Sequence, residues 1–245
     1  MSRDGGILAF NKWMEAILTN SKATRKARGC RVFNLGMVDF AEASQLQSEL
    51  IEQRIAGKIP DVILFLQHRP VITIGAFGGE QNIMVPRDVL EKEGISVTHT
   101  DRGGDVTYHG PGQLVGYPIL DLKTRGHDVH QYVHDLEEVM IRTLDDYSID
   151  AHRDTDYPGV WVGQEKICAL GIRVVHWVTK HGFALNISND LTPFSYINPC
   201  GITDRGTTSM QKVLGQEPKI GEVTNSIIRH FSAVFGINVH EAKWR

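Results

Sequence analysis

Cys200 has the sequence context of a catalytic nucleophile. It stands between Pro199 and Gly201, so it belongs to a predicted loop that can present the thiol to a cleft. Backbone amides in such a loop are free to bind an oxyanion, and a neighbouring cationic or basic group would shift the thiol toward a thiolate. The competing interpretation is an inert, half-buried cysteine, which composition alone favours.

Lys166 is the candidate partner of a nucleophilic thiol. It stands at the mouth of a predicted hairpin with an apolar interior, and a lysine that is partly withdrawn from water can act as a base near neutral pH. An exposed lysine beside Glu165 at a turn fits the same pattern. Because side chains alternate along a strand, we expect Lys166 and Cys168 on one face. Cys168 is therefore a competing thiol, and the residues alone do not choose between Cys168 and Cys200.

Residues 102–113 have the composition of a binding loop that leads into a strand. Gly103 and Gly104 allow positive φ or close approach to a ligand, whereas Val106 and Tyr108 alternate as in an extended strand. The pattern predicts a cradle for a ligand. A tight hairpin with an exposed polar rim fits the glycines equally well.

Three further histidines have alternative interpretations. His68 lies at the end of a predicted strand close to Pro70, which suits either a functional side chain or a histidine with its hydrogen bonds satisfied in a turn. His130 and His134 are four residues apart on a predicted helix and could share a metal ion. No third ligand stands at a matching place, so two surface histidines are the simpler interpretation.

Hydrophobic periodicity predicts the elements that must position these residues. Helices are expected from about residue 39 to 56, with Asp39 and Glu42 as caps, from Asp128 onward, and over a final stripe that includes Val223 and Phe231. Asp128 should start a helix with Val129, Val133, Leu136, Met140 and Leu144 inward. Strands are expected at 31–36, 62–66, 71–75, 95–100, 106–109, 114–119, 159–163, 166–175 and 182–187, with a polar break at 179–181. These elements indicate an α/β or α+β fold with a mixed sheet.

Length and composition describe an ordinary globular chain. With 245 residues and a net charge of −3, we expect one large domain that binds neither nucleic acid nor membrane. The three widely spaced cysteines suit free thiols in a reducing compartment such as the cytoplasm. Residues 1–29 are expected to be an extension of a domain at 30–245. The extension either docks on the domain or is an organelle-targeting peptide, although Asp4 and Glu15 disfavour the second interpretation.

Several linked motifs closely resemble the lipoyl(octanoyl) transferases, in the order and spacing of that family from about Cys30 to the last helix. The motifs are Arg102-Gly103-Gly104-Asp105-Val106-Thr107-Tyr108-His109-Gly110-Pro111-Gly112-Gln113-Leu114, Gly159-Val160-Trp161-Val162 with Lys166-Ile167, Ala169-Leu170-Gly171, Gly182-Phe183-Ala184-Leu185-Asn186, and Pro199-Cys200-Gly201-Ile202.

The resemblance implies a fold similar to that of biotin and lipoate protein ligases, a mixed sheet flanked by helices. It implies transfer of an octanoyl group from octanoyl-acyl carrier protein to a lysine of lipoyl domains, those of 2-oxoacid dehydrogenases and the glycine cleavage H protein, without a metal or cofactor. Cys200 would form the acyl-thioester intermediate, and Lys166 would tune and deprotonate it. The implied acyl-pocket residues are Arg102, Gly103, Gly104, Asp105, Val106, Thr107, Tyr108, His109, Ala169, Leu170, Gly171, Gly182, Phe183 and Ala184.

Within that pocket we expect Gly103 and Gly104 to approach the acyl chain, Val106 and Tyr108 to form an apolar wall, and Arg102 and His109 to fix polar parts near the thioester. Two residues depart from the family pattern. Arg69 adds a charge where the family tends to carry proline, and Cys168 replaces a small residue, which places a second thiol near the pocket. Candidate cations for docking acidic partners are Arg69, Lys123 and Arg125.

Three alternatives stay open at this stage. An ATP-dependent lipoate or biotin ligase would need a phosphate-facing loop and a lysine but no nucleophilic cysteine. An amidotransferase that moves octanoate or lipoate between lipoyl domains would use the same intermediate with another donor. A catalytically silent acyl- or carrier-protein-binding module would need neither residue.

Overall fold

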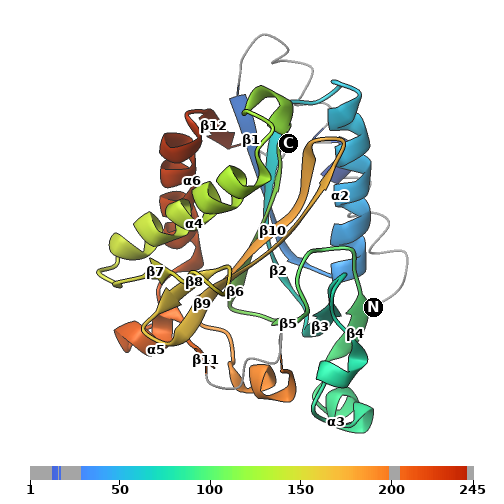
Figure 1. Ribbon diagram of the computed structural model, residues 1–245, viewed down its shortest axis with the longest axis vertical. Helices are drawn as coiled ribbons and strands as arrows, with labels where there is room; N and C mark the ends of the chain where they lie inside the picture. The colour runs from blue at the N-terminus through green and yellow to red at the C-terminus, as the bar shows by residue number, and fades with distance from the viewer. Residues whose placement is uncertain (1–12, 16, 18–28, 199–204, 242–245) are drawn as a thin grey trace.

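A nine-stranded mixed β-sheet organises the fold (Figure 1). The computed structural model describes residues 13–15, 17, 29–198 and 205–241. The strand order is β12-β1-β2-β6-β10-β9-β8-β7, with β11 beside β9. The strands are β1 (Gly29–Val38), β2 (Asp61–His68), β6 (Gln113–Ile119), β7 (His152–Arg153), β8 (Val160–Val162), β9 (Glu165–Val175), β10 (Val178–Asn186), β11 (Gly206–Thr207) and β12 (Asn238–Glu241). The predicted mixed sheet is confirmed.

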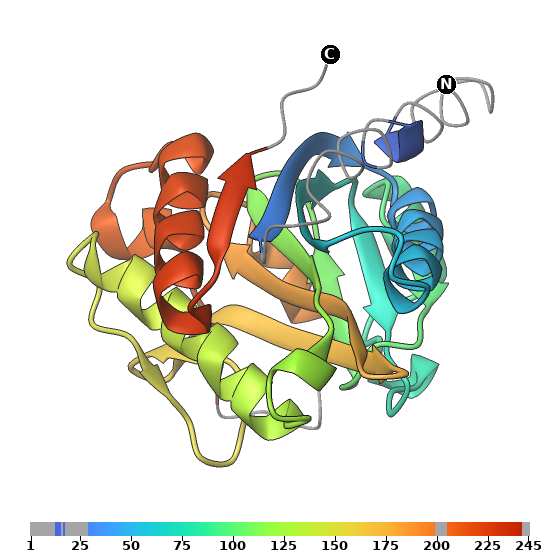
Figure 2. The same ribbon diagram turned by 90° about the horizontal axis from the view of Figure 1, so that it is seen from above.

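Helices cover both faces of this sheet (Figure 2). One face carries α2 (Phe40–Ile55), and the other carries α4 (Val129–Asp145) and α6 (Ile220–Phe235). The apolar run of β2 is divided between the two layers: Leu64 packs on the α2 side, whereas Ile63 and Phe65 pack on the α4 and α6 side. Full burial of each such side chain contributes about 1.5–3 kcal/mol, so a continuous apolar strand is stable here.

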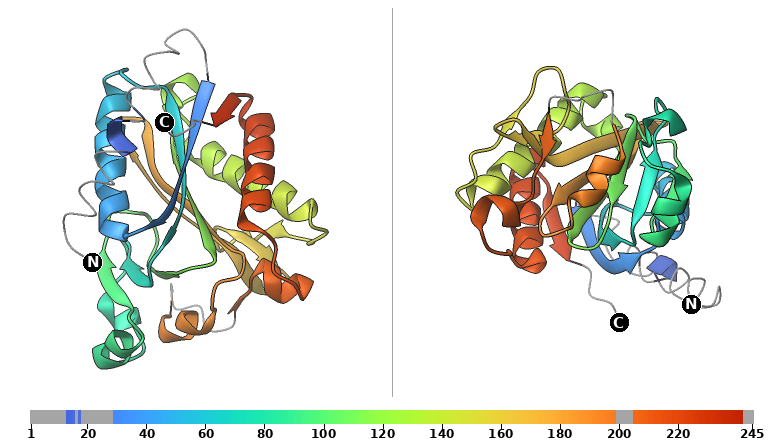
Figure 3. Two further views of the ribbon diagram at one scale, coloured as in Figure 1. Left: turned by 180° about the vertical axis from the view of Figure 1, so that it is seen from behind. Right: turned by 90° about the horizontal axis from the view of Figure 1, so that it is seen from below.

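A smaller three-stranded sheet lies at one end of the molecule, below α2 in Figure 1 and in the left view of Figure 3. Its order is β4-β3-β5, and it shares a separate apolar core with α3. The bounds are β3 (Val71–Ile74), β4 (Ser96–His99), β5 (Val106–His109) and α3 (Arg87–Lys92). The remaining short helices are η1 (Glu80–Asn82), η2 (Leu122–Thr124), η3 (Thr192–Tyr196) and α5 (Met210–Leu214).

The expected polar break at residues 179–181 is wrong, because these residues continue β10. Their polar side chains pair with residues that are distant in the sequence. The Thr179 hydroxyl donates to the Pro118 carbonyl oxygen at 2.7 Å, and the Lys180 ammonium lies 3.0 Å from both carboxylate oxygens of Asp101. His181 Nε2 lies 2.8 Å from the same carboxylate. Buried polar side chains with such partners fit inside a central strand.

The helix expected to start at Asp128 begins there, whereas the cap expected from Asp39 does not form. The Asp128 side chain accepts from the Gln131 amide at the start of α4. Asp39 occupies the N-cap position of α2 but makes no capping hydrogen bond, and its carboxylate lies 2.9 Å from Arg69 Nε instead. An ion pair with a distant turn thus replaces the expected local cap.

The inward face of α4 follows the prediction at its C-terminal half. Leu136, Met140 and Leu144 are fully buried, whereas Val129 and Val133 are only partly buried.

Near the N-terminus, Ile17 is fully buried in the core beneath α2. No helix among the described residues is long and apolar enough to cross a membrane.

Candidate active site

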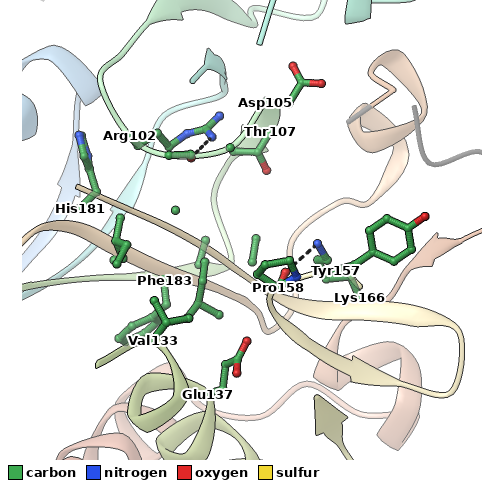
Figure 4. A pocket seen from close by; sticks show the side chains of 18 of the residues that line it. Arg102, Asp105, Thr107, Val133, Glu137, Tyr157, Pro158, Lys166, His181 and Phe183 are labelled. Atoms are coloured by element: carbon green, nitrogen blue, oxygen red, sulfur yellow. Dashed lines mark hydrogen bonds between the residues drawn. The ribbon is translucent and has the colours of Figure 1, made fainter. Parts of the chain in front are cut away.

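A cavity of about 620 Å³ runs between the loop at 102–107, strands β9 and β10, and one face of α4 (Figure 4). This volume lies in the usual range for small-molecule sites. It is lined by most of the residues that the family resemblance implies: Arg102, Gly103, Gly104, Asp105, Val106, Thr107, His109, Ala169, Leu170, Gly171, Gly182, Phe183 and Ala184, together with Lys166.

The glycine-rich loop is a wall of this cavity and not a hairpin, since β4 and β5, the strands that it connects, each pair with β3 and not with each other. Gly103 donates its amide proton to the Ile172 carbonyl oxygen at 2.9 Å, which fastens the loop to β9. A Cβ atom on Gly103 would lie 3.0 Å from that oxygen, and one on Gly171 would lie 3.0 Å from the Gly103 carbonyl oxygen. Glycine at both positions therefore allows the two backbones to touch.

Arg102 holds the wall onto the smaller sheet. Its side chain is buried, and its guanidinium donates to the Thr73 carbonyl oxygen at 2.7 Å and to the Thr73 hydroxyl at 2.9 Å. Asp105 accepts from the Asn82 side-chain amide at 2.6 Å. These hydrogen bonds fix the shape of the loop from behind.

Tyr108 is the residue of the implied pocket that does not line the cavity. Its ring packs edge to face on Phe194, with centroids 5.6 Å apart, inside the core of the smaller sheet. Val106, two residues earlier, does line the cavity. Only Val106 of the expected apolar pair therefore lies in the cavity wall.

Lys166 lies at one end of the cavity on an aromatic platform. Its Nζ donates to the Pro158 carbonyl oxygen at 3.1 Å and stands 4.7 Å from the ring centroid of Trp161. Arg205 also faces this ring, with Cζ 5.5 Å from the centroid, and pairs with Asp154 at 3.3 Å. A cation on an aromatic face typically gains about 0.5–2 kcal/mol, so Trp161 helps to hold both side chains. Trp161 stood in a quoted motif, but neither Trp161 nor Arg205 was among the predicted site residues.

Cys200 lies outside the described residues. On either side of residues 199–204, Ile197 and Arg205 both line the cavity. Strand β11 then runs parallel to β9, with Thr207 in register with Lys166.

Cys168 does not share a face with Lys166, so that expectation is wrong. The register between β8 and β9 shifts at Val160 and Trp161, so Trp161 opposes Lys166 while Val160 opposes Cys168. Such an irregularity redirects side chains relative to simple alternation. Cys168 is fully buried in the core beneath α4 and α6, and burial raises the pKa of its thiol.

The far end of the cavity holds neutral imidazoles. His68 is fully buried and does not line the cavity; the Val38 carbonyl oxygen accepts from its Nδ1 at 2.8 Å, so its Nε2 accepts from the Tyr117 hydroxyl at 2.7 Å. His109 and His181 do line the cavity. Burial lowers the pKa of His68 and of His181 to about 4, and that of His109 well below its ordinary value. The structure thus fits the satisfied-histidine interpretation of His68.

His130 and His134 also line the cavity, from α4. Among the described residues no group of three or more histidine, cysteine, aspartate or glutamate side chains could hold a metal ion.

Of the candidate docking cations, Arg69 pairs with Asp39 and Arg125 pairs with Asp61 at 3.2 Å.

Residues 39–232 match the model of the lipoyl protein ligase A/B catalytic domain. The chain is 47% identical to an octanoyltransferase of Desulforamulus reducens over 83% of this chain and 90% of that protein. It is 50% identical to an octanoyltransferase of Caldicellulosiruptor saccharolyticus over 82% of this chain and 87% of that protein.

Solved structures share the fold at low sequence identity. A lipoate-protein ligase A bound with ATP superimposes with a TM-score of 0.67 at 19% identity, covering 88% of both chains. A biotin protein ligase from Aquifex aeolicus gives a TM-score of 0.54 at 15% identity over 84% of this chain and 70% of that chain. The expected similarity of fold is confirmed. The matched domain and the identity to these relatives show that the chain belongs to the octanoyltransferases, which are acyltransferases of protein lipoylation.

Proposed function

We propose that this octanoyltransferase takes its acyl group from octanoyl-acyl carrier protein and passes it, through a thioester on Cys200, to a lysine of a lipoyl domain. The acceptors would be the lipoyl domains of 2-oxoacid dehydrogenases and the glycine cleavage H protein. Lys166 would serve as the proton carrier, and residues 102–107, 109, 169–171 and 182–184 would hold the acyl chain.

The position of Lys166 carries this proposal. Its Nζ stands at the end of a cavity whose walls include glycine backbone and apolar side chains, a surface that suits a hydrocarbon chain. Ile197 and Arg205, which flank the segment with Cys200, line the same cavity. A lysine and a thiol meeting at one end of an apolar slot would suffice for acyl exchange.

The chemistry balances without an energy source. The Cys200 sulfur attacks the thioester carbonyl carbon, a new carbon–sulfur bond forms, and the carrier's thiol leaves with the proton that Lys166 took from Cys200. In the second step the acceptor amine attacks the carbonyl carbon, the amide bond forms as the carbon–sulfur bond to Cys200 breaks, and the amine proton returns through Lys166 to the Cys200 sulfur. Because a thioester is already activated, neither step consumes ATP.

Transfer without ATP separates this proposal from a ligase on the same fold. The protein is incubated with octanoyl-acyl carrier protein and an apo lipoyl domain, and octanoylation of the domain is followed by mass. We expect transfer in the absence of ATP. Transfer that requires ATP and free octanoate would refute the proposal and support the ligase. An octanoylated lipoyl domain offered as donor tests the amidotransferase in the same assay.

Intact-mass spectrometry identifies the acylated thiol. With donor alone, we expect an octanoyl adduct on the wild type and on Cys168→Ala, and no adduct on Cys200→Ala. An adduct that persists on Cys200→Ala would assign the intermediate to another residue. No adduct on any of the three proteins would favour a silent binding module.

We also propose that residues 30–245 form a single catalytic domain in a reducing compartment such as the cytoplasm, with residues 1–29 as an extension. The free thiols of Cys30 and Cys168, both buried, are consistent with such a compartment. Among residues 1–29, Ile17 is buried in the core beneath α2, with Trp13 and Met14 packed against it, which favours an extension that docks.

A further inference from the structure

Glu137 is a buried carboxylate that lines the active-site cavity and has no part in the chemistry described above. It lies on α4, seven per cent exposed, below the Pro158 and Lys166 side chains in Figure 4. Burial of a carboxylate is costly unless hydrogen bonds and opposite charge compensate for it. Its partners therefore indicate what it holds in place.

Those partners lie on the segment that leads to the lysine. Glu137 Oε1 accepts the amide proton of Gly159 at 3.0 Å, and Oε2 lies 3.3 Å from Arg153 Nε. Gly159 takes a φ of +131°, and a Cβ atom there would lie 3.3 Å from Lys166 Cε and 2.8 Å from the Cys168 carbonyl oxygen. The Gly159 backbone is thus packed directly against the lysine side chain.

One peptide group joins the carboxylate to the lysine. The Gly159 amide that donates to Glu137 and the Pro158 carbonyl that accepts from Lys166 Nζ at 3.1 Å belong to the same peptide unit. A hydrogen bond from its N–H to an anion polarises a peptide and makes its carbonyl oxygen a stronger acceptor, since hydrogen bonds in a chain reinforce one another. The negative charge of Glu137 is thereby felt at the lysine ammonium.

We propose that Glu137 is a positioning residue for Lys166, which acts through the Pro158–Gly159 peptide and holds the ammonium where it can exchange a proton with the reacting thiol. The proposal rests on the proposed role of Lys166. Its alternative is a purely structural role, in which Glu137 only anchors Arg153 and the loop before β8.

Glu138 offers a matched control on the next position of α4. Its Oε2 lies 2.6 Å from the same Arg153, but it contacts Arg142 rather than Gly159, and it does not line the cavity. Glu138→Gln therefore weakens the anchoring of Arg153 and leaves the peptide link intact.

The test compares Glu137→Gln, Glu137→Ala, Glu138→Gln, Lys166→Ala and the double variant Glu137→Gln/Lys166→Ala in the transfer assay, with thermal unfolding to verify folding. We expect Glu137→Ala to lower kcat roughly 10- to 100-fold, the range for groups that orient a reacting residue. Glu137→Gln keeps an acceptor oxygen and should lose less. The pH midpoint for alkylation of Cys200 should move to higher pH in both, because the ammonium that stabilises the thiolate is less well held.

The double variant gives the decisive comparison. If Glu137 acts through Lys166, Glu137→Gln/Lys166→Ala should be no slower than Lys166→Ala. Three outcomes would each refute the link between Glu137 and Lys166. They are additive losses of activity in the double variant, an unchanged alkylation midpoint in Glu137→Gln, and a midpoint shift in Glu138→Gln equal to that in Glu137→Gln. If Lys166→Ala itself left transfer unchanged, the proposed role of Lys166 would fail first, and the role of Glu137 would fail with it.

Discussion

The two ends of the cavity are built from different chemistry. At one end Lys166 and Arg205 both lie against the Trp161 ring, with the carboxylates of Glu137 and Asp154 close by. At the other end His109, His181 and Tyr117 are neutral and hydrogen-bonded. His181 stands in register with Ile172, six residues along β9 from Lys166, which corresponds to roughly 20 Å at about 3.3 Å per residue.

The difference separates two tasks. The proposed proton carrier Lys166 must be held in position, and at its end of the cavity a carbonyl oxygen and an aromatic ring hold its ammonium. The histidine end is polar, but burial lowers the pKa of each imidazole more than its hydrogen bond raises it, so the imidazoles add shape and polarity without charge. Phe183 and the glycine wall lie between these ends.

Lys166→Ala should have the largest effect, because it removes the proposed proton carrier. We expect transfer to slow 10²- to 10⁴-fold, about what the loss of a positioned base costs. Alkylation of Cys200 at neutral pH should slow as well. Lys166→Arg, which keeps the charge but cannot release a proton, should restore alkylation more than transfer. An unchanged alkylation rate in Lys166→Ala would contradict the assigned role.

The histidine end should control stability in acid. The ordinary histidine pKa is 6.5, and burial lowers the pKa of His68 and His181 to about 4, so between these values the unfolded chain binds protons that the folded chain does not. The contribution of these histidines to the free energy of unfolding is therefore complete above about pH 6.5. It is lost as the pH drops toward 4, by up to about 3 kcal/mol for each histidine.

Urea unfolding at a series of pH values between 7 and 4 measures this loss. His68→Gln should show a shallower dependence on pH than the wild type, even if it is less stable at pH 7. His99→Gln, at a side chain that is 69% exposed, is the control and should keep the wild-type dependence. A wild-type slope in His68→Gln would exclude His68 as a source of acid instability.

Local sequence signals predicted the frame of this site well. The apolar run at 62–66, the Asp128 cap and the stripe of α6 depend on neighbours in sequence, and each element formed where expected. The glycine pair at 103–104 likewise marked a place of close backbone contact, because glycine has few other reasons to occur there.

Features decided by distant residues escaped prediction. Lys180 and His181 were interpreted as a break because their partner Asp101 lies 79 and 80 residues away. The irregular register beside Trp161 separates Lys166 from Cys168, and no local pattern reveals it. Strand β12 forms by pairing in parallel with β1 at the other end of the chain. In the sequence, nothing distinguishes Glu137 from other helical glutamates. The structure shows that it accepts a hydrogen bond from the Gly159 amide, 22 residues away.

Gly116→Ala tests the region between the two ends. A Cβ atom at Gly116 would lie 2.2 Å from the Phe183 ring, so the ring must move. We expect the free energy of unfolding to fall by about 1–3 kcal/mol, and the acyl preference to shift toward shorter chains as the ring moves into the cavity. Gly221→Ala, in the first turn of α6 with no other part of the protein within 4 Å of the added methyl, should instead stabilise the protein by at most about 0.5–1 kcal/mol. Equal effects of the two substitutions would contradict this account.

Tyr117→Phe should have the smallest effect and should separate stability from catalysis. It removes the hydroxyl that donates to His68 Nε2 at 2.7 Å and leaves a fully buried acceptor without that donor. We expect a loss of about 1–2 kcal/mol in the free energy of unfolding, since an unsatisfied buried group costs its desolvation. Transfer should stay within about twofold of wild type, because no charge near Lys166 changes. Tyr147→Phe, at a partly exposed tyrosine, is the control for unfolding. A large loss of transfer in a folded Tyr117→Phe protein would mean that the histidine end takes part in the chemistry, and the division between the two ends would be wrong.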